Sequence, residues 1–436
     1  MRKRTLFSEA LILPMTAEVG EPLTFEGWVG VEENRIVLVT SRAEEAEQFR
    51  HEAEELQEVD CRGKLLMPGL INTHCHVAMT LQRCYADDIP LMKWLNDHIW
   101  PFEAEQRPEE VALGAELGMA EMLLGGVTSF VDMYWDEHRI AEVADRLGIR
   151  ALLCASFIDT MFERNERDLE AALPLATDRV RVGVGPHAPY TVSKENLLRC
   201  KELCRQHNLP MTIHVAETLA EMEAVEQATG MTPVQWLDSL GLLDENTIAA
   251  HCVYVNEEDR ATLRKRGVKI AHNPTSNMKI SSGIAPVAAY LEEGMMPTIA
   301  TDGPSSNNDL DMWEEMRQAS FLAKVSTMNP LVLPAYEVLK MATRYGAAAI
   351  GHAEELGMIR SGALADLILI DLAKPHLQPL HDVVAALVYC GKASDVETVM
   401  VDGKLLVEKR EIKGVDLPAL YRSIDLALAR IKGEIH

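Results

Sequence analysis

The chain has 436 residues and a formal charge of −25, because 67 acidic residues outnumber 42 lysines and arginines. A surface this acidic repels nucleic-acid phosphates and anionic membranes, so we expect neither as a partner. We expect instead a small neutral or cationic substrate, or an anion that local arginines capture. No stretch of the sequence approaches the ~18 consecutive apolar residues of a membrane span.

The first 60 residues predict short strands at 6–15, 23–31 and 35–40, followed by a helical stretch at 44–55. From residue 65 the pattern changes to apolar runs separated by amphipathic stretches such as 108–125, 138–147, 194–206 and 256–266. There are eight such runs, at 65–72, 128–133, 150–155, 180–185, 211–215, 247–250, 268–271 and 297–300. Eight strand–helix alternations indicate a closed (β/α)8 barrel of the TIM type.

Beyond the barrel the alternation stops. Residues 365–371 and 396–407 read as strands, the second as a hairpin turning on Asp402-Gly403. We therefore predict an α/β chain in which a barrel at residues 65–354 is inserted into a small β-sandwich-like domain. That domain is built from both termini, residues 1–64 and 355–436.

The eight cysteines form no CxxC pair, and most of them lie in apolar segments. This usage is typical of a reducing compartment, so we expect a cytoplasmic protein.

Ionisable residues follow four of the predicted strands. His74 and His76 end the first, and their i, i+2 spacing places both imidazoles on one side of an extended backbone. His214 ends the fifth strand, His251 the sixth and Asp302 the eighth. Because barrel enzymes carry their sites at the C-terminal strand ends, these side chains should meet. Histidines and an aspartate suit zinc or Fe(II), so the pattern indicates a metallohydrolase.

Longer motifs around these residues resemble the amidohydrolase superfamily over residues 67–371. Within it, the chain looks like the deaminases of 5′-methylthioadenosine and S-adenosylhomocysteine. The motifs are LMKWLNDHIWPFE at 91–103, GVGPHAPYTV at 183–192, HVAET at 214–218, AHNPTSN at 271–277 and TDGPSSNNDLD at 301–311. The first of them is the most specific to these deaminases.

The resemblance implies one divalent ion, zinc before iron, bound by His74, His76, His214 and Asp302. A water would complete its coordination and become the nucleophile. The predicted strand at 180–185 has no lysine, whereas two-metal members of the superfamily commonly use a carboxylated lysine there. This absence favours one metal, and it favours deamination over the hydrolysis of cyclic amides.

Three residues receive catalytic roles from the resemblance. Glu217 would protonate the ring nitrogen of the substrate and later the leaving ammonia. His251 would orient the water or help to remove its proton, and Asp302 would serve as base and ligand. Glu217 and Asp302 therefore count as substrate-binding residues as well. Because Glu217 comes only three residues after His214, a turn must bring both side chains into the barrel mouth.

The remaining substrate contacts are also implied by resemblance. Glu103 and His187 would bind the ribose hydroxyls, and Trp94 would pack against the 5′ substituent. Relatives often carry an arginine where this chain has Ala155. Arg164 or Arg167 could replace that arginine, and Arg167 aligns better. The missing cation favours 5′-methylthioadenosine, adenosine or 5′-deoxyadenosine over S-adenosylhomocysteine, whose tail bears a carboxylate.

The predicted function is hydrolytic deamination of an adenosine-type nucleoside to its inosine analogue and ammonia, by an enzyme that we expect to be a homo-oligomer. One alternative is deamination of another amino-heterocycle of the guanine, pterin or triazine type. A different alternative is a non-catalytic scaffold, which should have lost metal ligands, whereas every ligand is present here.

Overall fold

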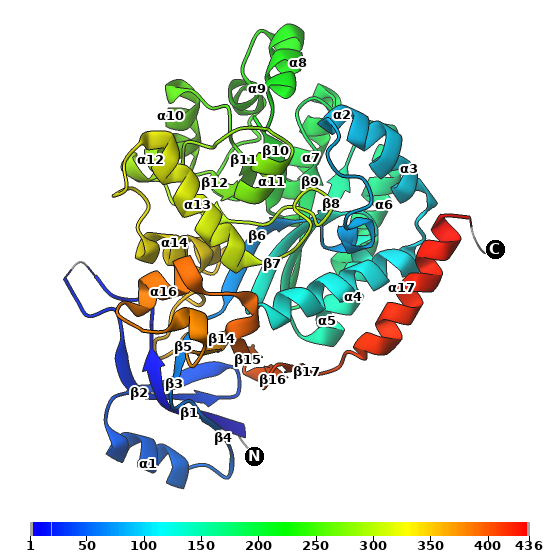
Figure 1. Cartoon of the computed structure of the whole chain (residues 1–436). Helices are drawn as coiled ribbons and strands as arrows, with labels where there is room; N and C mark the ends of the chain where they lie inside the picture. Colours follow the sequence, from blue (N-terminus) through cyan, green and yellow to red (C-terminus); the bar gives the residue numbers. More distant parts are fainter. Residues whose placement is uncertain (1–2, 19, 434–436) are drawn as a thin grey trace.

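The computed structural model describes residues 3–18 and 20–433. Its centre is a barrel of eight parallel strands, each hydrogen-bonded to the next in chain order (Figure 1). The strands are β6 (Leu70–Cys75), β7 (Val127–Tyr134), β8 (Arg150–Phe157), β9 (Val180–Pro186), β10 (Met211–Val215), β11 (Thr247–His251), β12 (Lys269–His272) and β13 (Thr298–Ile299). The predicted barrel is therefore confirmed.

Side chains join the first and last strands of the barrel. Asn72 and Thr301 exchange two hydrogen bonds: the Asn72 amide nitrogen donates to the Thr301 hydroxyl at 2.8 Å, and the Thr301 backbone N–H donates to Asn72 Oδ1 at 3.1 Å. The hydroxyls of Thr73 and Thr298 lie 2.5 Å apart. These buried contacts close the seam between β6 and β13, where backbone pairing is short.

A second, mixed sheet contains strands from both ends of the chain, as predicted. Its order is β17-β16-β15-β14-β5-β1-β2-β3, with β4 paired to β1. The strands are β1 (Lys3–Ile12), β2 (Phe25–Glu32), β3 (Arg35–Thr40), β4 (Glu55–Asp60), β5 (Lys64–Pro68), β14 (Leu367–Asp371), β15 (Val396–Val401), β16 (Lys404–Glu408) and β17 (Glu411–Ile412). Asp402 and Gly403 form the hairpin turn between β15 and β16 with positive φ values of 49° and 74°. The division of the chain at residues 64 and 354 stays a prediction.

The apolar run predicted as one strand at 65–72 is two strands. β5 pairs with β14 and β1 in the mixed sheet, whereas β6 pairs with β7 in the barrel. Gly69 separates them, and a Cβ there would collide with the side chain of Thr128. Both strands are buried, so hydropathy alone gives no sign of the change of sheet. The helical stretch predicted at 44–55 is also shorter than expected, because α1 (Ala43–His51) ends before β4 begins at Glu55.

Helices surround the barrel strands. Three of them, α2 (Leu91–Trp94), the π-helix η2 (Leu95–Ile99) and α3 (Trp100–Glu105), form one continuous segment after β6. The others around the barrel are α4 (Pro108–Leu124), α5 (Glu137–Leu147), α6 (Phe162–Ala172), α7 (Lys194–His207), α8 (Leu219–Thr229), α9 (Pro233–Ser239), α10 (Glu257–Arg266), α11 (Pro274–Lys279), α12 (Val287–Glu292) and α13 (Met312–Thr327). After the barrel come α14 (Ala335–Ala342), α15 (Arg344–Ala349), α16 (Val383–Cys390) and α17 (Leu417–Ile431).

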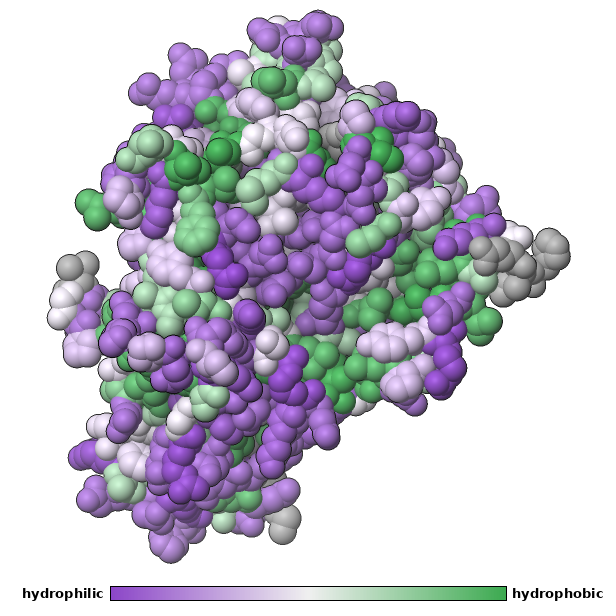
Figure 2. All heavy atoms as spheres, in the orientation of Figure 1, coloured by the Kyte–Doolittle hydropathy of each residue, from purple (hydrophilic) through white to green (hydrophobic). Residues whose placement is uncertain are grey.

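The last helix, α17, runs away from the β17 edge of the mixed sheet and packs beside α4 (Figure 1). Leu420 and Ile424 of α17 join Phe102 of α3 in a small apolar cluster. Figure 2 shows hydrophobic residues along this contact, on a face that is otherwise mostly hydrophilic. None of the helices in the described part of the chain combines the length and the apolar character that crossing a membrane requires.

Candidate metal centre and active site

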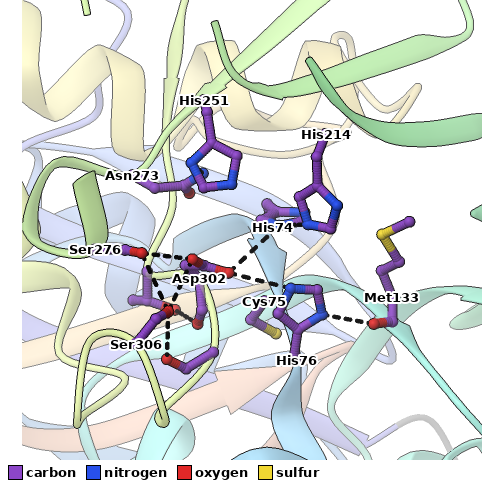
Figure 3. A network of polar contacts seen from close by, with 12 residues as sticks. His74, Cys75, His76, Met133, His214, His251, Asn273, Ser276, Asp302 and Ser306 are labelled. Carbon is purple, nitrogen blue, oxygen red and sulfur yellow. Dashed lines mark hydrogen bonds and ion pairs between the residues drawn. The ribbon is translucent and has the colours of Figure 1, made fainter. Parts of the chain in front are cut away.

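Four side chains converge at the C-terminal end of the barrel, and we call them the metal-binding group: His74, His76, His214 and Asp302 (Figure 3). Each offers one ligand atom, and all these atoms lie within 4.8 Å of one another. Asp302 Oδ1 lies 3.1 Å from His76 Nε2 and 3.6 Å from His74 Nε2. β6 and the residue after it, β10 and the segment after β13 supply these residues, as the strand-end pattern predicted.

The outward contacts of the histidines fit a shared cation. Nδ1 of His76 lies 2.6 Å from the carbonyl oxygen of Met133, and Nδ1 of His214 lies 2.6 Å from that of His187. A carbonyl only accepts, so both Nδ1 atoms donate and both Nε2 atoms face inward. Nε2 of His74 and Nε2 of His214 are 3.1 Å apart. Two nitrogen lone pairs this close repel each other unless a cation or a proton lies between them.

Two of the three histidines are held neutral, as metal ligands must be, whereas His76 carries a proton that a metal ion would displace. Burial lowers the pKa of His74 to about 4 and that of His214 well below its ordinary value, so both rings are neutral and able to bind metal at pH 7. Burial also opposes charge on His76, but hydrogen bonding and the charge of Asp302 outweigh it and raise its pKa to about 9. For Asp302, burial is outweighed by its histidine neighbours, which hold the pKa of the carboxyl well below its usual range.

Two serines hold the aspartate ligand. Ser276 Oγ donates to Asp302 Oδ2 at 2.6 Å, and Ser306 Oγ donates to the same oxygen at 2.9 Å (Figure 3). Both serines are buried. Since these hydroxyls engage Oδ2, the other oxygen, Oδ1, remains directed at the histidines. Neither serine was predicted as a site residue, although Ser276 lies in the motif at 271–277 and Ser306 in the motif at 301–311.

Glu217 and His251 lie beside the metal-binding group. The turn predicted after His214 is present: Ala216 has a left-handed φ of 53°. Oε1 of Glu217 is 3.8 Å from Nε2 of His251. Nδ1 of His251 donates to Oδ1 of Asn277 at 2.8 Å, which leaves Nε2 as the acceptor that faces the cavity. Burial raises the pKa of Glu217, as suits a group that must give up a proton near neutral pH.

A cavity opens onto these groups. Its lining includes Glu103, His187 and Trp94, together with His76, His214, Glu217, His251 and Asp302. Tyr134 donates its hydroxyl to Glu103 Oε1 at 2.8 Å, and burial raises the pKa of Glu103. Nδ1 of His187 lies 2.8 Å from the Thr191 hydroxyl, and burial lowers the pKa of His187 to about 4. The residues predicted to contact a nucleoside thus share one cavity with the metal-binding group.

Arg167 is the predicted site residue that the structure does not bring to this cavity. It is exposed on α6 and lines neither this cavity nor the adjoining one. Arg164, one turn earlier, instead lines an adjoining cavity that shares Glu103 with the first. Its Nη2 lies 3.1 Å from Asp136 Oδ2. Ala155 is fully buried in β8. Arg167 was preferred because it aligns better with the arginine of relatives. An alignment does not show which side of a helix faces the cavity.

Comparisons with known proteins agree with the site. The sequence pattern of the amidohydrolase family matches residues 65–406. A 5-methylthioadenosine/S-adenosylhomocysteine deaminase of Desulforamulus reducens is 41% identical over 99% of this chain and 100% of its own length. A 5′-deoxyadenosine deaminase of Methanothermobacter thermautotrophicus is 41% identical over 86% of this chain and 89% of its own length.

Among solved structures, a zinc-bound adenosine deaminase from Xanthomonas campestris superimposes with a TM-score of 0.93. It is 35% identical, and the match covers 98% of both chains. The motifs, the barrel and the four converging ligands lead to the same assignment as these comparisons: the chain belongs to the amidohydrolase family.

Proposed function

We propose that this protein hydrolytically deaminates adenosine-type nucleosides, replacing the 6-amino group by oxygen and releasing ammonia. The observation that carries the proposal is one cavity that joins the metal-binding group and Glu217 to Glu103 and His187. Metal ligands and a proton donor serve the chemistry, whereas a carboxylate and an imidazole nearby suit the hydroxyls of a ribose. The names of the two relatives described above, both 41% identical to this chain, support the same substrate class.

Zinc is the metal that we propose, because the ligands are three nitrogens and one oxygen and a similar solved structure contains zinc. When bound, it lowers the pKa of a water toward neutrality. Glu217 gives a proton to the ring nitrogen beside C6, which makes C6 electrophilic. His251, fixed by Asn277, orients the attacking water, and Asp302 accepts a proton from it. Glu217, left as a carboxylate, then takes the proton of the new C6 hydroxyl and delivers it to the amino group, so that the C6–N bond breaks and ammonia leaves. The proton held by Asp302 finally restores the acid form of Glu217.

The described residues that line the cavity include no lysine or arginine for the 5′ end of the substrate to meet. Ala155 offers no charge, and Arg164 is already paired with Asp136. We therefore propose that 5′-methylthioadenosine and 5′-deoxyadenosine are better substrates than S-adenosylhomocysteine, with Trp94 packing against the 5′ group. In this proposal Arg164, rather than Arg167, is the arginine nearest to the substrate.

Initial rates of ammonia release test the proposal. The panel is 5′-methylthioadenosine, 5′-deoxyadenosine, adenosine, S-adenosylhomocysteine, guanine and an amino-triazine. We expect the nucleosides with small uncharged 5′ groups to have the highest kcat/KM. A higher kcat/KM for guanine or the triazine than for any nucleoside would overturn the substrate class.

Two arginine variants on the same helix then test the 5′ preference. Arg164→Ala should change the ratio of kcat/KM between 5′-methylthioadenosine and S-adenosylhomocysteine by less than about threefold, and the exposed Arg167→Ala serves as the matched control. If S-adenosylhomocysteine is preferred by the wild type and Arg164→Ala alone abolishes that preference, Arg164 binds the carboxylate and the proposed 5′ selectivity is wrong.

We further propose a homo-oligomeric, cytoplasmic enzyme whose small domain comprises residues 1–64 and 355–436. All eight cysteines are free thiols, which supports a reducing compartment. Light scattering on the purified protein and fractionation of the source cells test the first two points. Limited proteolysis tests the third, since cleavage should occur near residues 64 and 354.

A further inference from the structure

Glu221 is a buried carboxylate outside the metal-binding group. It lies in the first turn of α8 and is 2% exposed. Both of its oxygens are engaged by backbone: Oε1 accepts the N–H of Ala216 and Oε2 accepts the N–H of Glu217, each at 2.8 Å. A single side chain thus holds the amide of a proposed catalytic residue and the amide before it.

This contact differs from the one that the local sequence predicts. Thr218 caps α8, and its hydroxyl accepts the N–H of Glu221 at 3.2 Å. In a capping box the glutamate three residues after the cap reaches back to the N–H of the capping residue itself. Here the carboxylate reaches further, to the two residues that precede Thr218. Glu221 is therefore a residue of α8 whose side chain binds the backbone of the turn that carries Glu217.

The turn needs such support because its backbone is unfavourable. Ala216 has a φ of 53°, a left-handed conformation that a residue with a Cβ rarely adopts without support from its surroundings. On the opposite side, the Ala216 carbonyl accepts the N–H groups of Val253 at 3.0 Å and Tyr254 at 2.9 Å. The turn is thus held from both sides, and Glu221 supplies all the contacts to its two N–H groups.

We infer that Glu221 is a positioning residue for the deamination, which fixes the Glu217 carboxyl against the substrate by clamping the backbone of the turn. The inference rests on the proposed function. A proton donor contributes only when it is held within hydrogen-bonding distance of the accepting atom, and a displacement of about 1 Å can cost ~100-fold in rate. Glu221 is not among the described residues that line the cavity of the metal-binding group, although it lines the neighbouring cavity, which shares Trp94 and Tyr190 with it.

Glu221→Gln tests this role, because it keeps the shape of the side chain but turns one acceptor into a donor that faces an N–H. We expect kcat for 5′-methylthioadenosine to fall about 10- to 100-fold, with KM and bound zinc within about twofold of the wild type. Glu223→Gln, the same substitution at an exposed position of α8, is the matched control and should leave kcat unchanged. Glu221→Asp, which keeps two acceptor oxygens, should recover part of the lost kcat.

A double-mutant cycle distinguishes positioning from general support of the fold. If Glu221 acts through Glu217, Glu221→Gln should lower kcat less than twofold in a Glu217→Gln background. Equal losses in both backgrounds, or a kcat for Glu221→Gln equal to that of Glu223→Gln, would overturn the inference. If the glutamine variant does not fold, the kcat of Glu221→Asp is compared with that of the wild type instead. An aspartate variant whose KM, bound zinc and kcat all equal those of the wild type also overturns the inference. A wild-type protein without deaminase activity would refute the proposed function instead, before any variant is compared.

Discussion

Replacing Ser276 by alanine tests how the aspartate ligand is held. The hydroxyl of Ser276 donates to Asp302 Oδ2 at 2.6 Å, and Ser306 donates to the same oxygen at 2.9 Å. Ser276 has no exposed surface, so solvent cannot readily replace its hydroxyl. The alanine variant therefore leaves the aspartate with one hydrogen-bond donor where it had two. The ionised carboxylate is then less stable, and its orientation toward the metal is less fixed.

The size of the effect follows from these bonds. A hydrogen bond to a charged group contributes ~1.5–3 kcal/mol, which corresponds to roughly 10- to 150-fold in a binding constant. Loss of a partner that orients a metal ligand typically costs ~10–100-fold in metal affinity. Because the Ser306 hydroxyl still engages Oδ2, we expect Ser276→Ala to weaken zinc binding by about 10- to 30-fold. Removing both hydroxyls should weaken it by about 100-fold or more.

The measurement is a zinc titration of metal-free protein against a chromophoric chelator of known affinity. Ser320→Ala is the matched control, because Ser320 is equally buried but donates to the carbonyl of Leu333 on another part of the barrel. It should cost some stability and leave zinc affinity unchanged. If Ser276→Ala binds zinc as tightly as Ser320→Ala, the serines do not support Asp302 and our reasoning about the ligand is wrong.

Three further predictions follow from single contacts. Glu217→Gln should keep its metal and lose ~10²–10⁴ in turnover, and a variant with full metal and near-normal turnover contradicts its role in proton transfer. Asp366→Asn breaks a buried bidentate pair with Arg150, at 3.0 and 3.1 Å, and should lower the free energy of unfolding in urea by ~3–5 kcal/mol; a loss below 1 kcal/mol argues against this pair as a support. The hydrogen bond to Asp168 raises the pKa of His138, so its stabilisation is complete below pH ~6.5 and is lost as pH rises through the raised pKa. His138→Gln should therefore lower Tm more at pH 6 than at pH 9, and an equal loss at both refutes this.

The barrel and its metal-binding group could be predicted because both depend on periodic patterns. A buried parallel strand reads as a continuous apolar run, and parallel strands bring their C-terminal ends together. The two histidines at positions 74 and 76 were therefore expected to meet His214 and Asp302, and in the structure all four ligand atoms lie within 4.8 Å. The family predicted from the motifs is confirmed by the match over residues 65–406.

Other features depend on which sheet a strand joins and on where side chains point, and a sequence shows neither. The division at Gly69 was not predicted, because β5 and β6 are both buried and read as one apolar run. Each of the two strands belongs to a different sheet. Arg164 and Arg167 occupy the same helix, but of these two it is Arg164 that lines the cavity next to the metal-binding group. Glu221 follows a threonine at the spacing of an ordinary helix cap, and only its contacts with Ala216 and Glu217 indicate another role.

Residues at the seam of the barrel, where β6 meets β13, contribute both to the stability of the fold and to the metal-binding group. β13 has only two residues, so its pairing with β6 relies on side chains such as Asn72 and on one backbone bond, from the Asp302 N–H to the His74 carbonyl at 3.1 Å. His74 and Asp302 are also two members of the metal-binding group, and they come from opposite sides of that seam. The complete ligand set therefore cannot form until the first and last strands meet. It follows that substitutions in the seam should change stability and metal affinity together, whereas Ser276, which lies outside the seam, should act mainly on affinity.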